Sequence, residues 1–180
     1  MFTTFTIPTI NVAGTIDMNH WKIAPQCILC CHRVSPELFQ LVDNIPLKHG
    51  RLVYHDLANM ISMIPSSLEG MSGPSPERIL KNDSTPKKRV VVATAGTTDL
   101  PVAEEAAVTL EAANCDVDRL YDVGVAGLHR VIMALPRLQD PDVGCVIVCA
   151  GMDGALPSVV GGLVSCPVVA VPTRYANGLV

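Results

Sequence analysis

Three glycine-containing loops carry the residues of this chain that are best suited to chemistry, and each loop follows an apolar, strand-like run. The first loop is Gly96-Thr97-Thr98-Asp99. Glycine lets the backbone approach a ligand closely, threonine hydroxyls donate hydrogen bonds, and the N-terminus of a following helix favours an anion. The loop is therefore suited to a phosphate or a ribose, with Asp99 able to hold sugar hydroxyls. The alternative is that Thr98 or Asp99 only caps the helix.

The second loop runs from Asp122 to Arg130 and ends in an adjacent histidine and arginine, His129 and Arg130. An arginine can bind a phosphate through two parallel hydrogen bonds, and a histidine can move protons near neutral pH. Gly124 and Gly127 indicate a backbone shaped for close contacts. The alternative is that both side chains are simply solvated on a short helix.

The third loop, Gly151-Met152-Asp153-Gly154, offers mainly backbone N–H groups. Asp153 could act as a carboxylate acid or base, although an aspartate in a turn more often only shapes that turn.

Six of the seven cysteines fall into two groups of interest. Cys145, Cys149 and Cys166 lie in or beside apolar strands, and we expect them in the core because reduced cysteine is among the most buried residue types. The cluster from Cys27 to His32 has ligand-like spacing, but a structural zinc site usually needs a second pair of ligands. We therefore expect no metal site.

The elements that must position the loops are apparent from Arg89 onward, where apolar strand-like runs alternate with helix-like segments. Strands are expected over 89–95, 116–121, 143–150 and 167–171. Helices are expected over 101–113, over 128–135 with an end at Pro136, and over the apolar segment 155–164. This alternation predicts an α/β domain with a three-layer, doubly wound (flavodoxin-like) parallel sheet. The carboxyl edge of such a sheet would bring all three loops together.

The chain before this domain has a weaker pattern. Residues 1–64 are expected to form an N-terminal extension of unclear fold, with short helices over 35–42 and 54–64. Small, turn-forming and charged residues dominate 65–88, which we interpret as a linker. The α/β domain is then expected to occupy 89–180.

Composition and charge exclude several classes of partner. The net charge is −4 and the acidic residues are concentrated after Arg89, so we expect no binding to nucleic acid. No apolar segment approaches the roughly 18 residues of a membrane-spanning helix, so we expect no membrane contact. No Lys or Arg precedes Lys22, which argues against a secretory signal or a transit peptide. A cytoplasmic protein is expected, with import into an organelle left open.

With their flanking residues, the loops resemble the superfamily of aminoimidazole ribonucleotide (AIR) carboxylases and N-carboxyaminoimidazole ribonucleotide mutases, over residues 88–173. The first loop stands where that superfamily has Gly-Ser-x-Ser-Asp, and its two His-containing loops are altered here. Three runs are most similar to the nickel-pincer cofactor biosynthesis carboxylase/hydrolase branch: Gly96–Ala106, Tyr121–Arg130 and Ala150–Val164.

The resemblance implies an enzyme that carboxylates the pyridine ring of nicotinic acid adenine dinucleotide and hydrolyses its phosphoanhydride, releasing AMP. It implies carbon dioxide or bicarbonate as co-substrate, no tightly bound cofactor, a small ribonucleotide as ligand and a homo-oligomer. The implied acid–base residues are Glu104, Glu105 and His129. The implied ligand contacts are Gly96, Thr97, Thr98, Asp99, Asp122, Arg130, Gly151, Met152, Asp153 and Gly154.

Two alternative functions accompany this expectation. One is the AIR carboxylase or mutase reaction of purine biosynthesis, which the altered His loops disfavour. The other concerns the end of the chain, because the nickel-pincer branch continues after Val-Pro-Thr through a glycine-rich loop to a cysteine that attacks the pyridine ring. Here Thr173 is followed by Arg174-Tyr175-Ala176-Asn177-Gly178-Leu179-Val180. We therefore expect a C-terminally truncated homologue, and the alternative is a binding or assembly subunit without catalysis.

Overall fold

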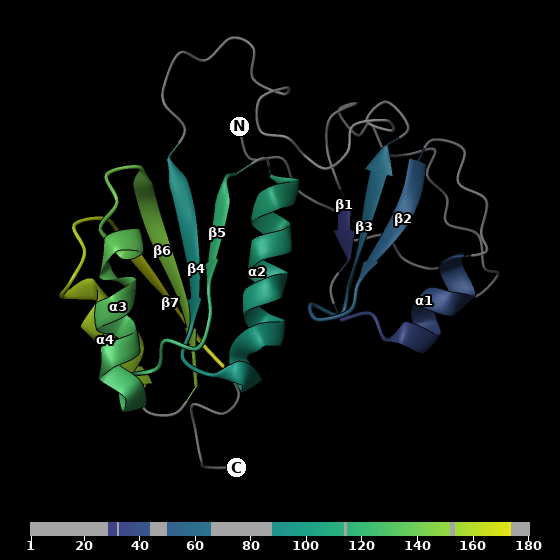
Figure 1. The fold of residues 1–180 in the computed structure, drawn as a ribbon. Helices are drawn as coiled ribbons and strands as arrows, with labels where there is room; N and C mark the ends of the chain where they lie inside the picture. The colour runs from purple at the N-terminus through teal and green to yellow at the C-terminus, as the bar shows by residue number, and fades with distance from the viewer. Residues whose placement is uncertain are drawn as a thin grey trace, which may run out of the picture.

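The apolar runs after Arg89 form a four-stranded parallel sheet in the computed structural model, which describes residues 29–31, 33–43, 50–65, 88–113, 115–151 and 154–173. Its strands are β4 (Arg89–Thr94), β5 (Val117–Leu120), β6 (Val143–Ala150) and β7 (Val168–Pro172). They lie in the order β5-β4-β6-β7, and every neighbouring pair is parallel (Figure 1).

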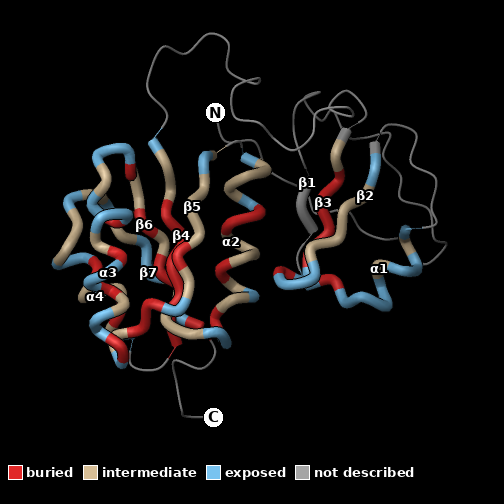
Figure 2. The backbone as a smooth tube through the Cα atoms, in the orientation of Figure 1, coloured by how far each residue is buried: buried red, intermediate tan, exposed pale blue. Residues whose placement is uncertain are grey.

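Helices cover both faces of this sheet. On one face lies α2 (Leu100–Ala112), and on the other lie α3 (Leu128–Leu138) and α4 (Ala155–Gly161). The short 3-10 turns η2 (Thr97–Asp99) and η3 (Val125–Gly127) lead into α2 and α3. Buried residues are concentrated along β4 and β6 (Figure 2). The predicted three-layer, doubly wound α/β fold is confirmed.

Two helix boundaries differ from the expected ones. Pro136 does not end α3, which continues to Leu138. Pro136 removes one backbone donor, but Leu138 is buried against the sheet and the Gln139 N–H donates to the Leu135 carbonyl at 2.8 Å, so the last turn is retained. The apolar segment after Ala155 is helical only to Gly161, and Ser158 is exposed, so α4 is not buried on all sides.

The N-terminal region contains a second, three-stranded antiparallel sheet, which the sequence did not reveal. Its strands are β1 (Leu29–Cys31), β2 (Gly50–His55) and β3 (Met60–Pro65), in the order β1-β3-β2. The predicted helix at 35–42 is present as α1 (Pro36–Asp43), whereas the one predicted over 54–64 is wrong. That segment is a hairpin, because Asn59 adopts a left-handed φ of 48° and turns the chain from β2 into β3. Residues 66–87 of the predicted linker lie outside the described residues.

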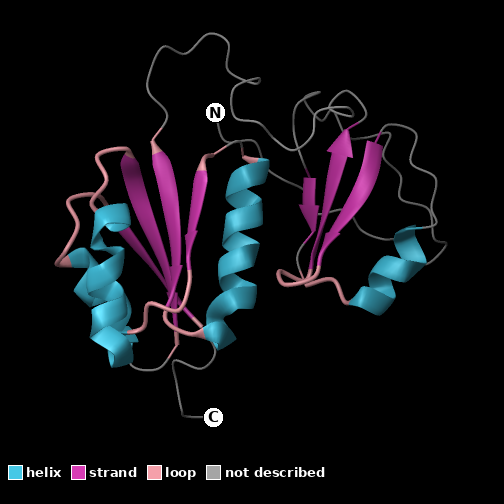
Figure 3. Ribbon diagram, in the orientation of Figure 1, coloured by secondary structure: helices cyan, strands magenta, loops and turns pink. Residues whose placement is uncertain are grey.

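Helix α2 is buried on two sides. Ala103 and Ala107 pack with Val92 and Cys149 of the parallel sheet. On the other side, Val108 packs with Ala58 and Met60 of the β2–β3 hairpin, and all three side chains are buried. Figure 3 shows the helix between the two sheets. This double burial accounts for the buried apolar residues on two sides of α2. Among the described residues, no helix is long and apolar enough to cross a bilayer.

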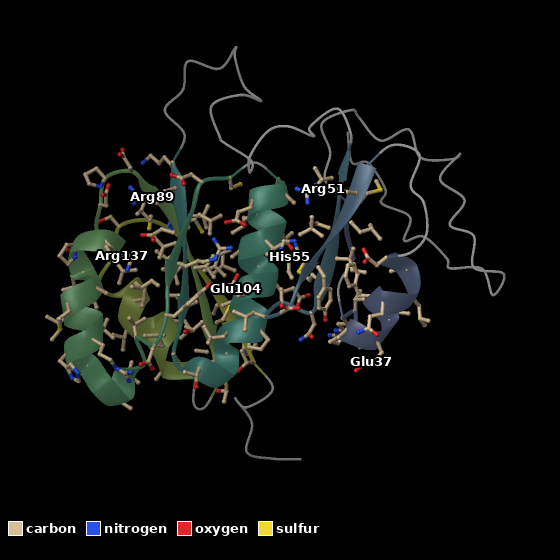
Figure 4. The ribbon with its side chains drawn as sticks, turned by 45° about the vertical axis from the view of Figure 1, so that its right-hand side comes forward. Glu37, Arg51, His55, Arg89, Glu104 and Arg137 are labelled. Carbon is tan, nitrogen blue, oxygen red and sulfur yellow. The ribbon has the colours of Figure 1, made fainter. Side chains whose placement is uncertain are left out.

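His55 lies at the polar part of this contact. Its ring Nε2 lies 2.9 Å from the Ser62 hydroxyl, and Figure 4 shows His55 between α2 and the three-stranded sheet. Burial lowers the pKa of His55, although Glu111 and Glu104 on α2 act in the opposite direction, and Arg119 of β5 lowers it further. The neutral imidazole is therefore the form that suits the docked sheet.

Acidification should weaken the docking of the three-stranded sheet on α2. An unfolded histidine has a pKa of about 6.5 and takes up its proton first, whereas docked His55 resists protonation. The stability contributed by neutral His55 is thus complete above about pH 6.5 and falls as the pH drops toward the lowered folded pKa. Hydrogen-exchange protection factors of β3 amides, measured at pH 7.5 and 5.5, should show a larger loss in the native protein than in His55→Gln. Equal losses would contradict this assignment.

Candidate active site at the carboxyl edge

The carboxyl ends of the four parallel strands meet at the lower edge of the view in Figure 1, and the predicted loops follow them there. The first loop follows β4, the second follows β5, and the third follows β6. From β4 the chain crosses to β5 on one side and later returns to β6 on the other side of β4. The topological switch point therefore lies between β4 and β6, which is where ligands of open α/β sheets bind.

The first loop is fixed by a buried carboxylate. Asp99 is only 3% exposed, and its Oδ2 accepts a hydrogen bond from the Gly96 N–H at 3.0 Å. Its Oδ1 accepts from the Thr173 hydroxyl at 2.7 Å, across the edge from the residue that follows β7. Thr97 and Thr98 are exposed, whereas the buried Asp99 shapes the loop from within. The role of Asp99 as a ligand contact stays a prediction.

The second loop is tied to the end of β4. Thr94 is fully buried, its hydroxyl oxygen accepts from the Asp122 N–H at 3.0 Å, and its carbonyl accepts from the Val123 N–H at 2.9 Å. Asp122 has a left-handed φ of 59°, which is uncommon for a residue other than glycine. Gly124 is buried, and a Cβ there would lie 2.5 Å from the Ala95 carbonyl oxygen. The first two loops are therefore in direct contact.

The predicted ligand contacts Asp122 and Arg130 form an ion pair through Asp122 Oδ2 and the Arg130 guanidinium. A Cβ on Gly127 would lie 2.5 Å from Arg130 Nε, so the absence of a side chain there makes room for the folded-back arginine. Both partners are partly exposed, and His129 beside them is exposed. The structure thus holds a cation at the edge, next to an accessible imidazole.

The third loop is described only at its ends. Gly151 is buried, and Gly154 has a left-handed φ of 57° that glycine adopts without strain. The Gly154 N–H donates to the Gly151 carbonyl at 3.1 Å, which closes the turn. The predicted contacts Met152 and Asp153 lie outside the described residues.

The two predicted glutamates of α2 have different surroundings. Glu104 Oε1 accepts a hydrogen bond from the Tyr121 hydroxyl at 2.7 Å, and Oε2 accepts one from Arg119 Nε at 3.2 Å. Its carboxylate is therefore bound to β5 and to the residue that follows β5. The negative charge of Glu105 affects the ionisation of the Cys149 thiol. Burial, followed by Asp99 and Glu105, raises the pKa of Cys149 to about 11. Cys149 is therefore a core thiol without nucleophilic activation, as expected for this strand.

Comparison with known proteins is decisive for the family. The model of the AIR carboxylase family matches residues 89–179, just over half of the chain. The chain belongs to the AIR carboxylase family. It is also 49% identical over 104 residues to an uncharacterized protein of Methanocaldococcus jannaschii. That alignment covers 56% of this chain and 41% of the relative, so the chain spans about two fifths of the relative's length.

Sequence reasoning missed three residues that organise the edge of this AIR carboxylase family domain. Thr94 forms hydrogen bonds with the second loop, and Thr173 forms one with Asp99 of the first loop. Tyr121 donates a hydrogen bond to Glu104. A single hydroxyl at the end of an apolar strand is the signal that could have identified Thr94 and Thr173. Tyr121 carries no comparable signal, because its partner lies 17 residues away on a helix.

A cavity of about 460 Å³ lies at the opposite edge of the family domain, where the strands begin. Its polar lining includes Gln139 and Asp140, but Asp140 pairs with Arg89 and the Gln139 amide donates to the Leu163 carbonyl. We therefore take the carboxyl edge as the candidate active site. In the described part of the chain, no group of three or more His, Cys, Asp or Glu side chains could hold a metal ion. The side chains of the Cys27–His32 cluster lie outside that part.

Proposed function

We propose that this chain binds a small ribonucleotide at the carboxyl edge of the parallel sheet and takes part in its carboxylation. Membership of the AIR carboxylase family suggests carboxylase- or mutase-type activity on a ribonucleotide. The observation that carries the proposal is the Asp122–Arg130 ion pair, on a loop that touches Ala95, the residue after β4, shortly before the exposed residues Thr97 and Thr98. This arrangement offers a cation and hydrogen-bond donors on one edge, which suits a phosphate ester of a sugar.

In the proposed complex, Arg130 leaves or shares its contact with Asp122 and binds the phosphate with charge-assisted hydrogen bonds. Thr97 and Thr98 donate to phosphate or ribose oxygens, and the backbone around Gly151 and Gly154 admits the ligand closely. We propose no tightly bound cofactor.

The proposed chemistry joins the carbon of carbon dioxide, supplied directly or from bicarbonate, to a ring carbon, which then gives up its proton. A pyridinium ring must first add a nucleophile, the step assigned to the cysteine of the nickel-pincer branch, and this nucleophile leaves again when the ring becomes aromatic. A base must accept that proton, and His129 and Glu105 are the candidates. His129 is exposed beside Arg130, and Glu105 lies near the end of β6. Glu104 is less suited to this role, because both of its oxygens accept hydrogen bonds within the protein.

Nicotinic acid adenine dinucleotide is the substrate we favour, with hydrolysis of its phosphoanhydride and release of AMP. The resemblance of Tyr121–Arg130 to the nickel-pincer branch supports this choice over AIR. We also propose a homo-oligomer. On α3, beside the site, Leu128, Ile132 and Met133 are more than half exposed, which supports coverage by a second copy.

Arg130→Ala should weaken the binding of nicotinic acid adenine dinucleotide at least about tenfold, because the phosphate loses a charged donor and meets the unpaired Asp122 carboxylate. Arg137→Ala is the matched control, since Arg137 lies on the same helix and pairs with Asp118 at the far end. Isothermal titration calorimetry gives both affinities. Equal affinities in the two variants would contradict the assigned role of Arg130.

Turnover separates the candidate functions. Incorporation of ¹³C from labelled bicarbonate into the pyridine dinucleotide, with release of AMP, is the expected result. Incorporation into AIR alone would instead assign the purine reaction, and nucleotide binding without incorporation would favour a binding or assembly subunit.

A further inference from the structure

One face of α2 connects the two sheets of the molecule. Glu104, Val108 and Glu111 are spaced four and three residues apart, which places them on one side of the helix. Val108 packs against Ala58 and Met60 of the three-stranded sheet. The two glutamates bind Arg119 of β5. This face therefore contacts the N-terminal sheet and the edge of the parallel sheet at the same time.

The carboxylate of Glu104 is held on both of its oxygens. Its side chain is only 14% exposed, and both carboxylate oxygens accept hydrogen bonds, from Tyr121 and from Arg119. Arg119 is itself held by Glu111, about two helical turns further along α2. A carboxylate with two fixed donors has a single favoured position. A displacement of α2 would therefore disturb the hydrogen bond from Tyr121.

Tyr121 stands at the start of the second loop. Burial, and then Glu104, raises the pKa of its phenol, so the hydroxyl keeps its proton and can donate to Glu104. The next residue, Asp122, has the left-handed backbone, donates its N–H to Thr94 and pairs with Arg130. The phenol therefore fixes the chain directly before the residue that holds Arg130 in place.

We propose that the three-stranded sheet β1-β3-β2 is a positioning element of the site: acting through Glu104 on α2, it holds Tyr121 and fixes the conformation of the Asp122–Arg130 loop. Glu104 is then a positioning residue and not a proton-transfer group. The inference rests on the proposed function only for the claim that this loop binds the nucleotide. The mechanical link itself depends only on contacts within the protein.

The link predicts coupling between Met60, at the far side of α2, and Tyr121, at the loop. The readout is amide hydrogen exchange, by NMR on the full chain, at Asp122 and Val123, whose N–H groups both bond to Thr94. Met60→Ala and Tyr121→Phe should each speed exchange at these two amides about tenfold, the size expected when one hydrogen bond to a charged group is lost. The double variant should be no faster than either single one, because both act through the same contact.

Two controls keep this double-mutant cycle interpretable. Leu57→Ala removes apolar atoms from the same hairpin at a position that is 59% exposed, and it should leave the loop amides unchanged. The Val146 amide, bonded to the Pro167 carbonyl within the parallel sheet, reports whether that domain stays folded. If Met60→Ala unfolds the chain, Val108→Ala gives a smaller loss at the same contact and should produce the same pattern to a lesser degree.

Either of two results would overturn the proposal: normal loop exchange in Met60→Ala and Val108→Ala, or fully multiplicative rates in the double variant. Titration of nicotinic acid adenine dinucleotide forms a separate arm, in which Met60→Ala should weaken binding several-fold. If the native protein does not bind this nucleotide, the proposed function fails, while the exchange data still decide the mechanical link.

Discussion

Asp99→Ala should lower the free energy of unfolding of the parallel-sheet domain by about 3 kcal/mol, because each hydrogen bond to a charged group contributes about 1.5–3 kcal/mol. The substitution leaves the Gly96 N–H and the buried Thr173 hydroxyl without their acceptor. It also separates the first loop from the end of β7. Urea unfolding followed by circular dichroism measures the change.

Two further substitutions test this explanation of the Asp99 effect. Asp99→Asn keeps one acceptor oxygen and should cost about half as much as the alanine variant. Thr97→Ala lies in the same loop but at an exposed position, and its effect should stay within about 0.5 kcal/mol. A loss in Thr97→Ala as large as that in Asp99→Ala would mean that general loosening of the loop, and not the buried carboxylate, determines stability.

Gly124→Ala should destabilise the domain by about 1–3 kcal/mol, the usual cost of forcing extra atoms into a packed site. The backbone at Gly124 is extended, with φ −60° and ψ 148°, so any residue can adopt it and the penalty is purely steric. The added Cβ would lie 2.5 Å from the Ala95 carbonyl oxygen and 3.2 Å from its carbonyl carbon. The two loops must then separate, and we expect nucleotide binding to weaken with the loss of stability.

Gly161→Ala is the matched glycine substitution for this test. Gly161 ends α4, is exposed, and has no atom within 4 Å of an added Cβ. Alanine there should stabilise the protein by about 0.4–1 kcal/mol by restricting the unfolded chain. Thermal unfolding of both variants gives opposite shifts if the contact at Gly124 is as close as described, and a stabilised Gly124→Ala would refute it.

The parallel-sheet domain could be predicted because local and global signals agree in it. Strands β4, β6 and β7 are short apolar runs, as required when helices cover both faces of a sheet, and glycine-containing loops separate strands from helices. The boundaries of α3 could not be predicted, because the retention of its last turn depends on the burial of Leu138 against strands distant in sequence. Local rules for proline describe only the lost hydrogen bond.

The hairpin over 50–65 was missed for a similar reason. Its residues alternate between two covered faces, with Met60 toward α2 and Tyr54 stacked on Phe39 of α1 at a ring separation of 4.9 Å. Because both faces carry apolar side chains, the simple alternation of a half-exposed strand is absent. Only the tertiary partners distinguish this run from a helix.

In the candidate site, too, local features could be predicted but contacts between residues distant in sequence could not. The sequence identified the loops and the Asp122–Arg130 segment, since residue types and glycine spacing are local. It could not reveal that Asp99 faces inward to Thr173, a residue 74 positions away, or that Glu104 turns toward Tyr121. The direction of each side chain depends on partners that are distant in sequence, and local residue types do not identify them.

The double burial of α2 has a consequence for the protein during its synthesis. The hairpin that carries Met60 leaves the ribosome before the helix that covers it. At about 5–20 residues per second, the roughly fifty residues between Met60 and Val108 take about 2–10 s to be made. During that time Ala58 and Met60 lack their helical partner. The exposed charges of Arg51, in β2, and Asp56, in the turn after it, lie within the hairpin, and charges in such positions limit the association of nascent strands with other chains.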